Sequence, residues 1–328
     1  MKVLLITQAR IGSTRLPGKV LLPIGEETLL SVHLKRLKKC TTINQIVVAT
    51  TFEDGVDRLI DISKDSEVDY YQGSLEDVLD RFFQAAVQYR PDWVVRITSD
   101  CPLIDSRVVD QVVNKALERN VDYCANIITE DFPDGQDVEV LKFSALQRAW
   151  KEATLKSERE HVTPFIKNSD AFKKIPIFNG NDFSDFRLTL DYKSDLNIFK
   201  KFEKIFPSEQ SITVATINSL ILKEPSFFSN HEGKFRGDGE FMSDYEKQWA
   251  YAEDIIPGGN SFFSKRPGLY NKQHWPPYYE SSKGCEVLTT DGKRLFDFGL
   301  MGVGVATLGF GDPSVDHAVK RSIDKGVS

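Results

Sequence analysis

Gln8-Ala-Arg-Ile-Gly-Ser-Thr-Arg-Leu-Pro-Gly-Lys19 is a basic, glycine-containing stretch that follows an apolar run at residues 3–6. The apolar run predicts a buried strand, and residues 29–39 beyond the stretch have apolar positions at helical spacing. In a strand–loop–helix unit, glycines let the backbone approach an anion, and backbone N–H groups converge on it. The loop adds three cations, Arg10, Arg15 and Lys19. We therefore expect a phosphate site, and three cations suit a triphosphate better than a single phosphate.

Two common phosphate-binding loops do not match this spacing. A Walker A loop has four residues between its first glycine and Gly-Lys, followed by Ser or Thr. Here five residues separate Gly12 from Gly18, and a valine follows Lys19. The dinucleotide pattern G-x-G-x-x-G is also not met around Gly12. A solvated basic turn with ordinary Pro-Gly chemistry is the alternative that these residues leave open.

The composition is typical of a globular protein. Charged residues make up 27% of the 328 residues and hydrophobic residues 41%, and the formal net charge is −6. A negative net charge argues against a nucleic-acid partner. No apolar run approaches the roughly 18 residues of a membrane helix, so we expect no membrane association. The four scattered cysteines form no C-x-x-C pair, which predicts free thiols in a cytoplasmic protein.

Apolar strands alternate with amphipathic helices over residues 1–140. Strands are expected at 45–50, 68–71 and 93–97, and helices at 56–63, 75–89 and 106–117. This alternation predicts an α/β fold with a mainly parallel sheet and helices on both faces. Ligands of such sheets bind beyond the carboxyl ends of the strands.

Two aspartates are candidate magnesium ligands. Asp100 directly follows the strand at 93–97 and precedes a proline turn, whereas Asp105 is explained as the cap of the next helix. In residues 186–192, Arg187, Thr189 and Asp191 alternate with leucines, which predicts a strand with one polar face. Plain solvent exposure is the alternative for that face. Asp195 is expected to cap a helix at 197–206, and a helix at 213–222 follows.

Several motifs together resemble the cytidylyltransferases that activate acidic sugars. They are residues 9–19, Ser-Asp-Cys-Pro-Leu-Ile-Asp at 99–105, Pro-Asp-Gly-Gln-Asp-Val-Glu at 133–139, Arg-Glu-His-Val-Thr at 159–163 and the polar strand ending at Asp191. The resemblance covers residues 1 to about 224 and is closest to the spore-coat-polysaccharide type, related to CMP-sialate and CMP-Kdo synthetases. It implies a Rossmann-like nucleotide-diphospho-sugar transferase fold and a homodimer. The implied reaction is Mg²⁺-dependent transfer of CMP from CTP to an acidic sugar.

The same resemblance implies a role for each matching residue. Catalytic roles fall on Arg10, Arg15, Lys19, Asp100 and Asp191, and the two aspartates bind the metal. The nucleotide is expected at Ala9, Arg10, Gly12, Ser13, Arg15, Lys19, Gly73 and Ser74, although a helix N-cap at Ser74 also explains the last two. The sugar is expected at Asp134, Asp137, Glu139, Arg159, His161 and Arg187. A plain acidic loop and a packed structural histidine are the alternatives for residues 131–140 and for His161.

The remainder of the chain carries a second resemblance. Residues 225–244 are rich in Ser, Asn and Gly and predict a linker. Residues 245–328 are similar to the N-terminal segment of class III, PLP-dependent aminotransferases of the glutamate-1-semialdehyde type. The lysine that binds PLP matches no position here, so we expect no covalent PLP and interpret the chain as a fragment of a longer fusion. That fusion would suggest an amino-substituted sugar.

Two other functions are compatible with the sequence. One is a sugar-phosphate nucleotidyltransferase that uses another nucleoside triphosphate. The other is a non-catalytic nucleotide-binding partner of the aminotransferase, against which the presence of two candidate metal carboxylates argues.

Overall fold

A computed structural model describes residues 1–13, 15–129, 131–206, 212–228, 279–289, 294–297 and 308–326. The chain divides into two compact units, residues 1–236 and 237–328. Within the described ranges, no helix is long and apolar enough to cross a membrane. The sequence of residues 245–256 predicts a further helix, and this helix and the expected linker beyond residue 228 lie outside the described residues.

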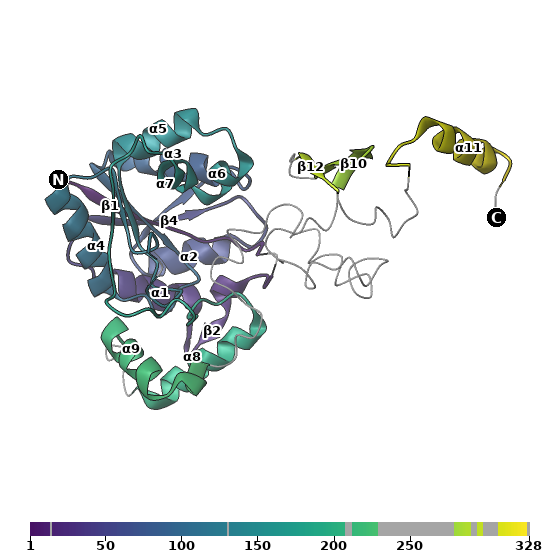
Figure 1. Ribbon diagram of the computed structural model, residues 1–328. Helices are drawn as coiled ribbons and strands as arrows, with labels where there is room; N and C mark the ends of the chain where they lie inside the picture. Colours follow the sequence, from purple (N-terminus) through teal and green to yellow (C-terminus); the bar gives the residue numbers. More distant parts are fainter. Residues whose placement is uncertain are drawn as a thin grey trace. The chain divides into compact units, whose positions relative to one another are not determined.

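A seven-stranded sheet forms the centre of the first unit, in the order β5-β4-β1-β6-β8-β7-β9 (Figure 1). The pairs β5–β4, β4–β1, β1–β6 and β7–β9 are parallel, and β8 runs antiparallel to both of its neighbours. This arrangement confirms the α/β fold with a mainly parallel sheet. The strands are β1 (Val3–Gln8), β4 (Gln45–Thr50), β5 (Asp69–Gln72), β6 (Trp93–Thr98), β7 (Tyr123–Ala125), β8 (Glu139–Lys142) and β9 (Lys174–Pro176).

Helices cover both faces of this sheet (Figure 1). Alternate residues of β1 point to opposite faces, as the period of a strand requires. Leu4 and Ile6 pack with α3, α5 and α7, whereas Val3 and Leu5 pack with α4. Helices α1 and α2 cover Val48 of β4 on the second face. The bounds are α1 (Leu29–Leu37), α2 (Asp57–Asp65), α3 (Val78–Tyr89), α4 (Ser106–Arg119), α5 (Phe143–Glu152), α6 (Lys156–His161) and α7 (Pro164–Asn168).

The order of the strands reverses between β1 and β6. The chain runs from β1 outward through β4 and β5, then returns to place β6 on the other side of β1. At such a reversal the loops after the two strands diverge and leave room for a ligand. Residues 9–19 and 99–105 are these loops.

A smaller layer, rich in phenylalanine, packs against Leu29 at the start of α1. It contains α8 (Leu196–Ile205), α9 (Val214–Lys223) and the short 3₁₀ helix η4 (Pro225–Phe228). Phe227 and Phe228 of η4 are buried against Phe202 of α8. The packed unit therefore extends at least four residues beyond the boundary expected at residue 224.

Two local expectations were wrong. Residues 186–192 form no strand, because they pair with the rest of the protein only through a single parallel bridge between Asp134 and Arg187. Helix α3 begins at Val78 and is capped by Asp77 rather than Ser74. Asp195 is the N-cap residue of α8, as expected, but its carboxylate accepts the N–H groups of Asp191 and Tyr192 and none from α8. Asp105, in contrast, caps α4 as expected.

The second unit contains a three-stranded antiparallel sheet and a helix. Strands β10 (Tyr279–Lys283), β11 (Glu286–Thr289) and β12 (Arg294–Phe296) pair in sequence order, and α11 spans Pro313–Asp324. Residues 284–298, with the pair Asp291-Gly292, predict a hairpin, and residues 313–325 predict a helix. Strands β11 and β12 and helix α11 confirm these two predictions, whereas the Asp-Gly turn itself lies outside the described residues.

A buried histidine joins α1 to the loop after β6. His33 has no exposed surface, and its ring nitrogens lie 3.0 Å from Thr7 Oγ1 and 3.0 Å from the carbonyl oxygen of Cys101. A carbonyl can only accept, so Nδ1 carries the proton and Nε2 accepts from Thr7. Burial lowers the pKa of His33 to about 4. The neutral ring thereby holds the backbone directly after Asp100.

We predict that His33 makes the fold acid-sensitive. The unfolded chain binds a proton at this residue near pH 6.5, while the folded protein does so only near pH 4. The stabilising contribution is therefore complete above about pH 6.5 and is lost as the pH falls toward 4, by about 2 kcal/mol between pH 7 and 4.5. Urea unfolding of the wild type and of His33→Gln at several pH values measures this. Equal pH slopes for the two proteins would contradict the prediction.

Candidate functional site

The basic loop after β1 is folded back on itself by backbone hydrogen bonds. The carbonyl of Ile11 accepts the N–H groups of Ser13 and Gly18, both at 2.9 Å. Gly18 has φ of 68°, in the left-handed region that glycine adopts without steric cost. Directly after it, the 3₁₀ helix η1 (Lys19–Leu21) begins. The turn at Gly18 thus sets the direction in which the Lys19 side chain leaves the loop.

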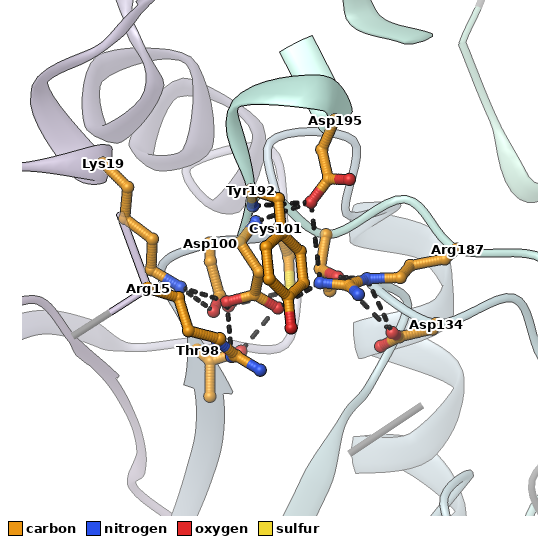
Figure 2. Close-up of polar contacts among 11 residues, drawn as sticks. Arg15, Lys19, Thr98, Asp100, Cys101, Asp134, Arg187, Tyr192 and Asp195 are labelled. Carbon is orange, nitrogen blue, oxygen red and sulfur yellow. Dashed lines mark hydrogen bonds and ion pairs between the residues drawn. The ribbon is translucent and has the colours of Figure 1, made fainter. Parts of the chain in front are cut away.

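Lys19 and Arg15 bind the two predicted metal carboxylates. The ammonium of Lys19 lies 2.6 Å from Asp100 Oδ2 and 2.7 Å from Asp191 Oδ1. Arg15 Nη2 lies 2.6 Å from the same oxygen of Asp191. Figure 2 shows Arg15 and Lys19 reaching the carboxylates from the basic loop. Residues far apart in the sequence therefore meet in one cluster, and the catalytic and metal-binding roles expected for these four stay predictions.

Burial and opposite charges compete at this cluster. Burial of Lys19 favours its neutral form, but Asp100 and Asp191 outweigh this and raise the pKa of the ammonium. Burial of Asp100 favours its protonated form, but Lys19 and the hydrogen bonds from Thr98 and Cys101 hold the pKa of this carboxyl well below its usual range. The cluster is therefore charged on both sides across the physiological pH range.

Arg187 approaches Asp191 from the other side (Figure 2). Its guanidinium binds the second oxygen of Asp191, donates to Thr189 Oγ1 at 2.7 Å and lies 3.6 Å from both Asp134 and Asp195. The side chain of Arg187 is only 4% exposed. The polar face predicted for residues 187–191 thus exists, but it is turned into the site rather than toward solvent.

Two buried guanidinium nitrogens of this cluster have no hydrogen-bond partner among the described residues. They are Arg15 Nη1 and Arg187 Nη1, whose guanidinium groups lie 5.5 Å and 5.3 Å from the ring centre of Tyr192. A buried polar group without a partner costs free energy. Unpaired donors on two cations are suited to an anionic ligand.

The carboxylates at this site are a partial set of metal ligands. Within the described residues, no group of three or more His, Cys, Asp and Glu side chains is arranged to hold a metal. Mg²⁺ is commonly held by one or two protein carboxylates, with substrate phosphates and water as the other ligands. Asp100 and Asp191, held together by one ammonium, fit that pattern.

A second group of buried polar atoms comes from the last residues of strands β1 and β4 and from helix α3. Gln8 Oε1, Thr50 Oγ1 and Arg81 Nε have no hydrogen-bond partner among the described residues. Arg81 is 1% exposed, and burial together with the charge of Arg10 lowers its pKa to about 10. The sequence analysis missed these residues. The sequence feature that could have indicated Arg81 is its position among the apolar residues of one helix face, beside Val78 and Phe82.

The other predicted nucleotide residues lie around this group. Gly73 follows β5, and an added Cβ would lie 3.0 Å from Arg81 Cγ. Arg81 donates to the carbonyl of Ser74. Ala9 is buried and its N–H donates to Ala49. The N–H of Gly12 donates to Glu53 Oε1 at 3.0 Å.

The predicted sugar residues are distributed unevenly. Asp134 joins the Arg187 cluster, and the charge of Asp137 reaches Cys101, beside Asp100. Arg159 binds Asp77 and the carbonyl of Trp150, and His161 ends α6. Glu139 is 1% exposed and binds Arg96 and Tyr123. A sugar contact by any of these residues stays a prediction.

Comparison with known families identifies the fold and its chemistry. A family model described as "Cytidylyltransferase" matches residues 4–252. The chain belongs to this family. As a cytidylyltransferase it is a nucleotidyltransferase, and the site described above lies entirely within the matched residues.

Individual relatives agree with this assignment. A solved cytidylyltransferase from Leptospira borgpetersenii superimposes with a TM-score of 0.67 at 36% identity, covering 70% of this chain and 98% of that one. The Bacillus subtilis spore coat polysaccharide biosynthesis protein SpsF is 27% identical over 70% of this chain and 98% of its own length. The 3-deoxy-manno-octulosonate cytidylyltransferase of Chlorobium chlorochromatii is 29% identical over 41% of this chain and 53% of its own length.

We predict that Glu139 is needed for the stability of this cytidylyltransferase. Glu139→Gln keeps the size of the side chain but removes the carboxylate that pairs with the buried cation of Arg96, so the free energy of unfolding should fall by about 3 kcal/mol. Urea denaturation measures this. Glu152→Gln is the matched control, because Glu152 pairs with Arg148 at the surface and should contribute less than about 1 kcal/mol. Equal losses in the two variants would contradict the prediction.

Proposed function

We propose that this cytidylyltransferase transfers CMP from CTP to an acidic sugar of the ulosonate type, with Mg²⁺, and releases pyrophosphate. The observation that carries the proposal is the cluster in which the loop cations Lys19 and Arg15 meet Asp100 and Asp191. It combines groups that bind phosphates with groups that bind a metal, at the reversal between β1 and β6. A site that only bound nucleotide would have little need of both carboxylates.

The basic loop would hold the triphosphate. The cations of Arg10, Arg15 and Lys19, with backbone N–H groups such as that of Gly12, would neutralise the phosphates. Their charges would also stabilise the pyrophosphate as the bond to the α-phosphate breaks. Arg15 keeps one buried guanidinium nitrogen for this purpose.

Asp100 and Asp191 would hold Mg²⁺. When bound, the metal would polarise the α-phosphate and lower the pKa of the attacking hydroxyl. Asp100 supplies a negative charge in a fixed position, because Lys19 holds the pKa of this carboxyl well below its usual range. The remaining contribution of the site is positioning of the two substrates.

The nucleoside and the sugar would occupy opposite sides of this cluster. Gln8, Thr50 and Arg81 offer buried acceptor and donor atoms suited to the edge of a pyrimidine base. Arg187 offers a buried cation with a free donor, which suits the carboxylate of an acidic sugar. The relative named for 3-deoxy-manno-octulosonate supports an acidic acceptor.

Three further expectations remain predictions. The homodimer stays a prediction. The resemblance of residues 245–328 to class III aminotransferases is likewise untested, and the cytidylyltransferase match extends to residue 252, past the residue at which that resemblance begins. A role for PLP therefore forms no part of the proposal.

The proposal is tested by pyrophosphate release with each of the four nucleoside triphosphates and a panel of acidic sugars. We expect turnover with CTP and Mg²⁺. Asp100→Asn and Asp191→Asn keep the side-chain size but remove a charge, so each should lower kcat by about 100-fold or more. Asp185→Asn, an exposed carboxylate in the same segment as Asp191, is the control and should keep the parental rate. Parental turnover in either site variant, or a preference for another nucleotide, would contradict the proposal.

A further inference from the structure

The ammonium of Lys19 lies where the proposed metal would have to bind. It is within 2.7 Å of one oxygen from each of the two carboxylates, and these are Asp100 Oδ2 and Asp191 Oδ1. The lysine side chain is 13% exposed, so water contributes little to its solvation. A divalent ion bound by the same two oxygens could not share the site with this ammonium, because like charges at that separation repel strongly.

We propose that Lys19 is an internal counter-ion that the metal must displace, and that the triphosphate makes this displacement possible. The inference rests on the proposed function and adds a binding order to it. Metal alone binds the protein weakly, and metal and nucleoside triphosphate each strengthen the binding of the other.

The charges in the cluster give the reason. A metal ion that displaced Lys19 without a nucleotide would leave a largely buried ammonium with no counter-charge, which is costly. A triphosphate supplies new negative partners for Lys19 and Arg15, so both carboxylates become available to the metal without loss of an ion pair. The coupling is reciprocal, because a change in the affinity for one ligand implies the same change for the other.

The loop amide shows the same kind of internal pairing. Glu53 Oε1 accepts the N–H of Gly12 at 3.0 Å, and Thr51 Oγ1 holds the other carboxylate oxygen at 2.5 Å. A carboxylate of the protein thus takes the place that a phosphate oxygen would take on this amide. Side chains of the protein therefore occupy both kinds of group: Lys19 binds the two carboxylates proposed for the metal, and Glu53 binds the amide of Gly12 proposed for a phosphate.

The proposal predicts that removing Lys19 strengthens metal binding. Mn²⁺ is titrated into the wild-type full chain and into Lys19→Met, without nucleotide, and binding is followed by electron paramagnetic resonance of the free ion. We expect the dissociation constant for Mn²⁺ to fall by about tenfold or more in Lys19→Met, because two buried carboxylates lose their cation. Lys19→Arg keeps the charge and should show no gain.

Two further variants show where the ion binds. Lys19→Met combined with Asp100→Asn should lose the gain, because one of the two carboxylates is neutral. Arg15→Met removes an ion pair to one of the two carboxylates, Asp191, and should give a smaller gain. This variant also provides a test if circular dichroism shows that Lys19→Met does not fold. Mn²⁺ binding that is unchanged or weaker in both Lys19→Met and Arg15→Met would overturn the proposal.

The outcome separates this inference from the proposed function. Turnover of CTP that depends on Asp100, with no gain in metal binding in the lysine variant, would leave the function intact and reject the exchange. A gain in metal binding without turnover of CTP by the wild type would support the exchange and reject the function.

Discussion

The bridge from Lys19 to Asp100 and Asp191 is the interaction on which the geometry of this site depends. It brings the loop after β1, the loop after β6 and the segment after Arg187 to one point. Each partner is buried enough that its charge would be costly alone, so the three positions are tolerated only together. Loss of any one of these three charges would leave a buried charge unpaired. A ligand that supplies a charge of the same sign can take the place of one of the three.

The surrounding structure restricts each of these segments separately. Gln136 lies in the turn after Asp134 and binds the N–H of Asp105 and the carbonyl of Leu103, so the acidic turn is fixed to the loop that carries Asp100. His33 holds the same loop from α1. Gly135 has φ of 96°, and an added Cβ would lie 2.9 Å from the backbone of Leu188, so only glycine permits this approach. The carboxylates are therefore positioned by buried backbone contacts rather than by the ion pairs alone.

The sequence predicted the parts of the fold that depend on local pattern. Strand and helix periods located β1, β4, β6 and their helices, and the rule that ligands bind at the carboxyl ends of strands placed Asp100 beside the basic loop. The sequence could not predict that residues 186–192 lack a ladder, because alternation describes the side-chain period and not the presence of a partner strand.

Residues whose role depends on tertiary burial were the ones that local reasoning missed. Arg81 lies on the apolar face of its helix, but only the tertiary structure shows that its side chain is buried and packs against Gly73. Glu139 was predicted from its motif to bind sugar, and the structure gives it the buried partners Arg96 and Tyr123, which no local pattern could indicate. Lys19 was predicted to bind phosphate, but its contact with both aspartates required the three-dimensional arrangement.

The most direct test of this account is the position of the metal and of Lys19 when a nucleotide is bound. Crystals of the wild-type protein with Mn²⁺ and a non-hydrolysable CTP analogue would give both from anomalous scattering. The account predicts a manganese peak in coordination contact with both Asp100 and Asp191, about 2 Å from their oxygens, with the Lys19 ammonium moved onto a phosphate oxygen. Manganese bound by the phosphates alone, with Lys19 still between the two carboxylates, would contradict it.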